Sequence, residues 1–256
     1  MLAVVVAYHK NDNEDFLEKF ERMLASIEFE GFEDNIFITL DGAAPDYIDG
    51  TIKKFSLKPQ NVVFSTVNVG NYCLKFKLID KIWPKFKYVK FCDFDDTSCS
   101  YQKMLKICEL YKDSELIVCR TTRWSCFVNY WEKIFSMKLF TAIPKFECFT
   151  GGDVIIAWMS FYECFKYNWK FSFCGELIYY KTKEASRTCR EKKPEEYLLL
   201  KTDSEEIKNI LFYAETIESK HIYKKDSNIL NIDFKALTKT INLNDFICHL
   251  GLHYKY

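Results

Sequence analysis

The strongest constraint on the fold is a short apolar run at the start of the chain, LAVVVA at residues 2–7. It is β-branched, continuous and uncharged, as expected of a central parallel strand that is buried on both faces. Further short apolar runs then alternate with segments of helical spacing. We expect strands at residues 35–40, 62–65, 88–92 and 115–119, and helices after residue 13 and at 44–55, 72–82 and 100–111. This alternation predicts an α/β fold with a mostly parallel sheet flanked by helices.

Beyond residue 120 the pattern is less regular. The aromatic segment 128–143 is ambiguous, a strongly apolar helix is expected after Gly152-Asp153, and residues 169–180 predict one or two strands. A segment rich in Lys, Arg and Glu follows, and Thr202 with Glu205 forms a capping-box pattern that opens a helix. We therefore expect a main domain at residues 1–195 and an α-rich C-terminal extension, residues 196–256, packed on it.

Charge and cysteine content narrow the class of protein. Formal net charge is zero, because 36 Lys and Arg balance 36 Asp and Glu, so no global field draws the chain to nucleic acid or an anionic membrane. The 11 cysteines are irregularly spaced, which favours reduced thiols in a cytosol-like compartment. The longest apolar run, residues 154–162, is too short to span a bilayer. We expect a soluble cytoplasmic protein, in the host cytoplasm if the chain is viral.

Three carboxylates crowd the end of the strand expected at 88–92: Asp93, Asp95 and Asp96. Like charges this close raise one another's pKa, and a divalent cation relieves the repulsion. Mg²⁺ and similar cations take oxygen ligands and often bridge one or two carboxylates to substrate phosphates. A polar turn that closes the strand with local hydrogen bonds is the alternative. The cluster alone leaves both interpretations open.

Two further polar features fall at strand ends, namely Asp41 and the turn from Asn68 to Gly70. In mostly parallel sheets, ligands bind at the carboxyl ends of the strands. Together with the aspartate cluster, these features indicate a binding site at one edge of the sheet.

In this order, the features resemble family-2 glycosyltransferases of the GT-A type, over roughly residues 2–190. The first strand ends in a Pro-x-Tyr-like turn, with Ala7 in the Pro position before Tyr8. A strand ending in an acid and Gly, an Asn-x-Gly turn and an Asp-x-Asp-Asp strand end then follow. The matching segments are 41–42, 68–70 and 93–96, and later Gly152-Asp153 and, more loosely, 180–183.

The resemblance implies a GT-A-like (Rossmann-like) fold and transfer of a sugar from a nucleotide-diphosphate donor to an acceptor hydroxyl, with inversion. Mn²⁺ or Mg²⁺ would be held by Asp95, with Asp93 or Asp96 assisting, and Asp153 would be the general base. The residues expected to bind the nucleotide sugar are Ala7, Tyr8, Asp41, Asn68, Gly70, Asp93 and Lys181. Lys183 stands where related enzymes often carry a His that can ligate metal. The acceptor would be a glycan, a lipid-linked glycan or a hydroxylated DNA base.

Two alternative functions remain open. Asp93-x-Asp95-x-Thr97 after a hydrophobic strand also resembles the first motif of haloacid-dehalogenase-type phosphatases, with Asp93 as nucleophile and Asp95 as acid and base. That family usually begins with this motif, whereas about 90 residues precede it here. A non-catalytic GT-A-like module would bind a nucleotide sugar or glycan without turnover. The lysines at 75–90, interleaved with aromatic residues, fit either single-stranded nucleic acid or the charged outer face of a helix.

Overall fold

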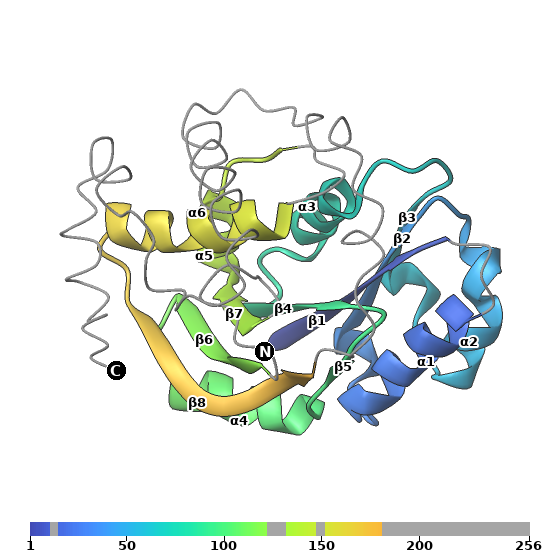
Figure 1. The fold of residues 1–256 in the computed structure, drawn as a ribbon, viewed down its shortest axis with the longest axis horizontal. Coiled ribbons are helices and arrows are strands. Elements are labelled where there is room, and N and C mark those ends of the chain that lie inside the picture. The colour runs from blue at the N-terminus through green and yellow to red at the C-terminus, as the bar shows by residue number, and fades with distance from the viewer. Residues whose placement is uncertain (11–14, 122–131, 147–151, 181–256) are drawn as a thin grey trace, which may run out of the picture. The chain divides into compact units, whose positions relative to one another are not determined.

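The computed structural model describes residues 1–10, 15–121, 132–146 and 152–180, with the backbone alone at residues 71, 152–155, 158 and 165. All of them belong to the compact unit Met1–Asp203. They form a mixed eight-stranded sheet in the order β3-β2-β1-β4-β7-β6-β8-β5 (Figure 1). The strands are β1 Leu2–His9, β2 Ile36–Asp41, β3 Val62–Ser65, β4 Tyr88–Asp93, β5 Thr97–Ser98, β6 Leu116–Thr121, β7 Lys133–Ser136 and β8 Phe171–Tyr180. The helices are α1 Asp15–Ile27, α2 Asp49–Lys54, α3 Asn71–Ile82, α4 Tyr101–Leu110, α5 Met137–Ala142 and α6 Gly152–Lys166, with 3-10 turns η1 Glu33–Asn35, η2 Pro45–Ile48 and η3 Pro59–Asn61.

The first half of the sheet is parallel and confirms the prediction made from the opening apolar run. β1 lies between β2 and β4 and is parallel to both, and β2 is parallel to β3. Every residue of β1 except His9 is buried. A strand with neighbours on both sides and helices on both faces needs apolar side chains at consecutive positions, which is the pattern of residues 2–7.

The second half of the sheet is mixed. β7 is antiparallel to both β4 and β6, β6 is parallel to β8, and β8 is antiparallel to the two-residue β5. The ambiguous segment 128–143 thus contains β7 and α5 from residue 133 onward, and its residues 128–131 lie outside the described part. Residues 169–180 form one strand, β8, whose pairing with β6 shifts register after Val118.

Helices cover both faces of the sheet (Figure 1). One face carries α1, α2 and α4, and its core joins alternate residues of β1 and β2 to Phe20, Leu24 and Met104. The other face carries α3, α5 and α6, where Phe91 of β4 lies 4.9 Å from Phe140 of α5 between ring centroids. Both faces of the sheet are therefore buried under helices, and the ends of the strands reach the edge of the sheet.

Most predicted elements lie within one or two residues of the observed ones. The helix expected at 44–55 is instead η2 followed by the short α2. β5 and β7 were not predicted. The expected boundary at residue 195, the extension at 196–256 and the helix opened by Thr202 lie outside the described residues and stay predictions.

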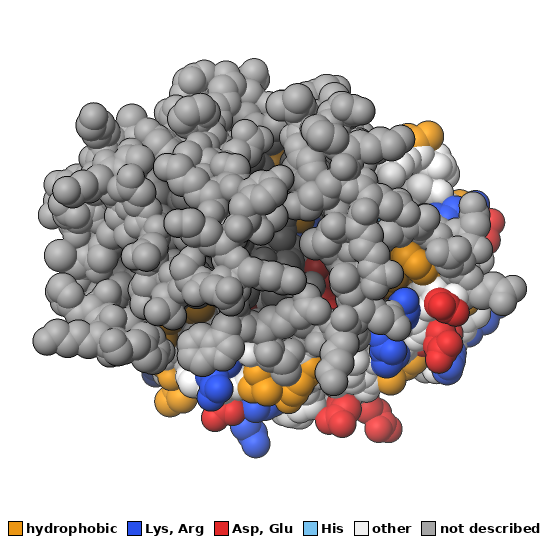
Figure 2. All heavy atoms as spheres, viewed as in Figure 1, with side chains coloured by type: hydrophobic (Ala, Val, Ile, Leu, Met, Phe, Trp, Pro, Cys, Tyr) orange, Lys and Arg blue, Asp and Glu red, His pale blue; other side chains and the backbone are white. Residues whose placement is uncertain are grey.

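Three properties of the described residues bear on the expected class of protein. In the described segments, no helix combines the length and apolar character needed to cross a membrane. On the face seen in Figure 2, the coloured acidic and basic side chains are interspersed and do not gather into a patch of one sign. The seven cysteines of the described segments are all free thiols, and six of them are buried.

Candidate active site

The carboxyl ends of β2, β1 and β4 bring the expected polar residues to one edge of the sheet. In register, His9 of β1 is opposite Asp41 of β2, and Ala7 of β1 is opposite Asp93 of β4. The first strand thus separates the two aspartates by one strand's width. Ala7 contributes its backbone, since its carbonyl accepts the Phe94 amide at 3.2 Å. The predicted shared edge is therefore present.

Asp41 clamps the turn that precedes α3. Its Oδ1 accepts the Val69 amide and its Oδ2 accepts the Gly70 amide, each at 2.9 Å. The Asn68 side chain also accepts the Gly70 amide, at 3.2 Å. Gly70 has a φ of 84°, a conformation that glycine adopts without steric cost. Three residues expected to bind nucleotide sugar are thus in contact, and the first function of the Asp41 carboxylate is to hold this turn.

Tyr8 is fully buried next to this edge. Its ring packs against Phe20 and Phe94, with centroids 4.6 and 5.0 Å away, and stacks at 6.2 Å with the more exposed Tyr47. Its hydroxyl has no partner with hydrogen-bond geometry within the described residues. Burial, and then the nearby Tyr47 hydroxyl, raise the pKa of Tyr8 far above its usual value. The phenol is therefore a buried group that keeps its proton.

Tyr47 and Lys10 were not predicted to belong to the site. The Lys10 ammonium lies 5.5 Å from the centroid of the Tyr47 ring, a distance at which a cation is attracted to the ring face. Tyr47 lies in η2, shortly after the Asp41-Gly42 strand end. Its proximity to the strand end was the only available signal, and an aromatic residue in a turn is too common to single out.

The aspartate turn after β4 divides its carboxylates between two environments. Asp93 and Asp95 are half-buried, whereas Asp96 is 2% exposed. The Asp96 amide reaches back to the Asp93 carbonyl at 3.4 Å. Arg22 of α1 donates to the Asp95 carbonyl at 3.4 Å. The three carboxylates that sequence analysis grouped together are thus not equivalent.

Tyr179 of β8 contacts both ends of this turn, and sequence analysis missed it. Its hydroxyl accepts the Asp93 amide at 2.9 Å and donates to Asp96 Oδ2 at 3.0 Å. The ring is fully buried and lies 4.6 Å from the Lys90 ammonium. Burial, followed by the Asp93 and Asp96 carboxylates, raises the pKa of Tyr179 well above its usual value, so the hydroxyl keeps the proton that it donates.

The residues present fit a divalent cation shared with a substrate. Among the described residues, no group of three or more His, Cys, Asp or Glu side chains is arranged to hold a metal by itself. Mg²⁺ is commonly held by only one or two carboxylates plus substrate phosphates. The half-buried Asp93 and Asp95 supply that donor set, whereas the Asp96 carboxylate is engaged by Tyr179.

The remaining expected residues are only partly visible. Asp153 lies in the first turn of α6, which is the predicted position at a helix N-terminus, but its side chain is not described. Lys181 and Lys183 follow β8 and lie outside the described residues. The lysines at 75–90 are of two kinds, because Lys75 and Lys90 are buried and the four others are exposed. The strip is therefore not one charged outer face.

The chain matches no protein-family model and no curated protein. Solved structures do match. TarS of S. aureus aligns with 96% of this chain at 15% identity and a TM-score of 0.55, and the chain spans about half of that protein, 48%. A structure of TarS 1–349 in complex with UDP has a TM-score of 0.52 at 15% identity, with 96% of this chain and 80% of that chain covered. The mannosyltransferase PcManGT of Pyrobaculum calidifontis, in complex with GDP-Man and Mn²⁺, has a TM-score of 0.50 at 11% identity, with 96% and 83% covered.

These neighbours establish the fold. The chain has a GT-A-like fold and resembles glycosyltransferases in structure, as the order of motifs predicted. At 11–15% identity they show the fold alone. The roles of the individual site residues remain predictions.

Proposed function

We propose that this protein is a glycosyltransferase that moves a sugar from a nucleotide-diphosphate donor to an acceptor hydroxyl. The observation that carries this proposal is the convergence of Asp41, the Asn68–Gly70 turn and the Asp93–Asp96 turn at the carboxyl edge of a GT-A-like sheet. Ligands bind at this edge in sheets of this kind. The UDP and GDP-Man complexes of the structural neighbours support the same substrate class. The fold gives no support to the phosphatase alternative.

In this proposal the donor lies across the ends of β1, β2 and β4. Tyr8, whose hydroxyl has no hydrogen-bond partner among the described residues, and the backbone at Ala7 contact the nucleoside, as do the Asp41 carboxylate and the turn that it holds. Asp93 and Asp95 face the diphosphate and would hold Mn²⁺ or Mg²⁺ there. When bound, such a cation supplies Lewis-acid neutralisation of the leaving diphosphate. Lys181, which follows β8 in the sequence, would contact the donor as well.

The chemical step that fits this arrangement is a single displacement with inversion. The acceptor oxygen forms a bond to the anomeric carbon while the bond from that carbon to the phosphate oxygen breaks, and the nucleoside diphosphate leaves. Asp153, at the start of α6, takes the proton from the acceptor hydroxyl as general base. We expect a glycan or lipid-linked glycan as acceptor, with a hydroxylated DNA base as the second choice.

A thermal-shift experiment tests the donor site. Wild type, Asp95→Ala and Asp113→Ala are heated with UDP, GDP and their sugar conjugates, with and without Mn²⁺ or Mg²⁺. Asp113 is an exposed aspartate between α4 and β6 and serves as the control. A ligand at 100 times its Kd stabilises the fold by about 2.7 kcal/mol. We expect a metal-dependent rise in melting temperature with one nucleotide, retained in Asp113→Ala and lost in Asp95→Ala.

Two results would contradict the proposal. If no nucleotide shifts the wild type with either metal, the donor site is absent. If a nucleotide sugar binds but the nucleoside diphosphate is never released in the presence of any acceptor class, the chain is a binding module and not a transferase.

A further inference from the structure

We propose that Tyr179 is a positioning residue that sets the geometry of the Asp93–Asp96 turn. In this proposal the Asp96 carboxylate accepts the Tyr179 hydroxyl and anchors the turn to it, and it is not a metal ligand. This inference rests on the function proposed above. It assigns separate tasks to three aspartates that the sequence presents as one cluster.

The Tyr179 hydroxyl contacts both ends of the Asp93–Asp96 turn. The described pairing of β4 with β7 ends at Lys90, so the Asp93 amide lies beyond that ladder and donates to the Tyr179 oxygen at 2.9 Å. The same oxygen donates to the Asp96 carboxylate at 3.0 Å. A buried carboxylate without a donor is costly, and Asp96 is 2% exposed. Tyr179 therefore forms a hydrogen bond with the backbone amide of Asp93 at one end of the turn and with the side chain of Asp96 at the other.

Tyr179 is itself held in place. Ser98 of β5 is opposite Tyr179 in the antiparallel pairing with β8, and Ile178 accepts both the Cys99 amide at 2.9 Å and the Ser98 hydroxyl at 3.2 Å. The segment that leaves the turn is thereby tied to the strand that carries the tyrosine. The Lys90 ammonium against the ring adds a contact from the strand that enters the turn.

The contacts of Tyr179 influence the positions of the two half-buried carboxylates, Asp93 and Asp95. Asp93 begins the turn and Asp95 lies between the two positions that Tyr179 contacts. Metal and phosphate ligands must be held to within about 0.5 Å of their productive geometry, and groups that orient the ligands provide that precision. Losing the hydroxyl should therefore weaken metal-dependent binding of the donor more than it weakens the fold.

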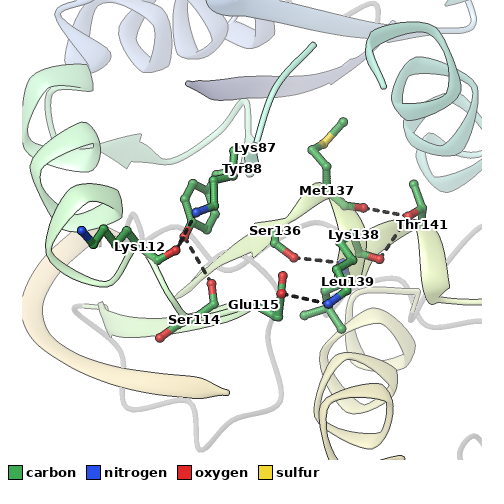
Figure 3. A network of polar contacts seen from close by, with 10 residues as sticks. All are labelled: Lys87, Tyr88, Lys112, Ser114, Glu115, Ser136, Met137, Lys138, Leu139 and Thr141. Carbon is green, nitrogen blue, oxygen red and sulfur yellow. Dashed lines mark hydrogen bonds and ion pairs between the residues drawn. The ribbon is translucent and has the colours of Figure 1, made fainter. Parts of the chain in front are cut away.

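The matched control is Tyr88, a buried tyrosine at the start of β4, the strand that leads into the Asp93–Asp96 turn. Its hydroxyl donates to the Lys112 carbonyl at 2.9 Å and lies 3.3 Å from the Ser114 carbonyl, as Figure 3 shows. Its distance to the Tyr111 carbonyl is 3.4 Å. Tyr88→Phe and Tyr179→Phe thus each remove one buried hydroxyl that contacts more than one polar group. Only the second of these hydroxyls touches the aspartate turn.

The experiment titrates Mn²⁺ with UDP and with GDP into wild type, Tyr179→Phe, Tyr88→Phe and Asp96→Asn by calorimetry, with the unfolding midpoint of each variant measured in parallel. We expect Tyr179→Phe to lose at least tenfold in Mn²⁺-dependent affinity, and Tyr88→Phe to stay within twofold of wild type at a comparable midpoint. Asp96→Asn keeps an oxygen that can accept from Tyr179, so its affinity should stay within about threefold of wild type.

The failures can be told apart. If wild type binds neither nucleotide, the proposed function falls and this inference falls with it. If wild type binds and Tyr179→Phe binds equally well, the positioning role alone is refuted. If Tyr179→Phe does not fold, Asp96→Asn still decides, because a tenfold loss of Mn²⁺-dependent affinity in that variant would make Asp96 a metal ligand and overturn the assignment.

Discussion

Asp41→Asn is the most informative single substitution for the architecture of the site. The change keeps the shape of the side chain but replaces one carboxylate oxygen with an amide NH₂ group. In the folded protein both oxygens accept backbone amides, from Val69 and Gly70, and the side chain is 3% exposed. An asparagine can accept only one of these amides, so its NH₂ group must face the other donor.

The size of the effect follows from these two bonds. A hydrogen bond to a charged group contributes about 1.5–3 kcal/mol, and a neutral one about 1 kcal/mol. Asparagine converts one charged bond to a neutral bond and loses the other, and the Asn68 side chain still accepts the Gly70 amide at 3.2 Å. We expect a loss of about 3 kcal/mol in the free energy of unfolding. With a urea dependence of about 3 kcal/mol per molar, the midpoint would fall by about 1 M.

Urea unfolding followed by circular dichroism measures this loss, with Asp46→Asn as the control. Asp46 lies in η2 close to the same strand end but is exposed, and such surface changes usually stay within about 0.5 kcal/mol. An Asp41→Asn midpoint equal to that of the control would contradict this role of the carboxylate. That outcome would mean that the carboxylate does not hold the turn and is available entirely to a ligand.

Two further predictions concern neighbouring groups. The Lys54 ammonium, 2.6 Å from Glu21, and then the Thr51 hydroxyl lower the pKa of Glu21 below its usual 4.5. A carboxyl group whose pKa is lowered by folding stabilises the fold at pH values above its unfolded-state pKa. This stabilisation is lost as the pH falls through the folded-state pKa. Glu21→Gln should therefore cost less than about 1 kcal/mol at neutral pH, because the pair is partly exposed. Its melting temperature should converge with that of wild type near pH 3, and a constant difference would contradict this. Tyr8→Phe removes a buried hydroxyl that has no partner with hydrogen-bond geometry in the described part of the chain, so it should raise stability by about 1 kcal/mol without ligand while weakening nucleotide binding. A loss of stability on urea unfolding would show instead that Tyr47 satisfies the hydroxyl.

The parallel half of the sheet could be predicted because its signals are local. Buried parallel strands need uninterrupted apolar runs, and β1 and β2 have them. β7 has four residues inside an aromatic segment without periodicity, and β5 has two residues whose strand conformation depends on pairing with β8. A strand that exists only because of a distant partner leaves no pattern in its own sequence.

The candidate site was predictable to the same extent. Asp41 and Asp93 lie at one edge of the sheet because each stands at the end of a parallel strand. Their positions after the two apolar runs are enough to predict this. Which carboxylate faces inward depends on a side chain far along the chain, since Tyr179 is 83 residues from Asp96 and 86 from Asp93. The burial of Lys90 has the same origin, because the aromatic ring that covers it comes from β8.

In the proposed function, the negative charges at the carboxyl edge of the sheet must be balanced when a nucleotide diphosphate binds. Asp41 is engaged by backbone amides and Asp96 by Tyr179, and the proposed function assigns the half-buried Asp93 and Asp95 to the cation. One divalent cation balances only those two charges, so the charge of a nucleotide diphosphate needs a second source of neutralisation. Arg22, which donates to the Asp95 carbonyl, is one described cation that contacts the turn. The basic residues from Lys181 onward follow β8 directly in the sequence, and in the proposed function Lys181 would supply part of this neutralisation.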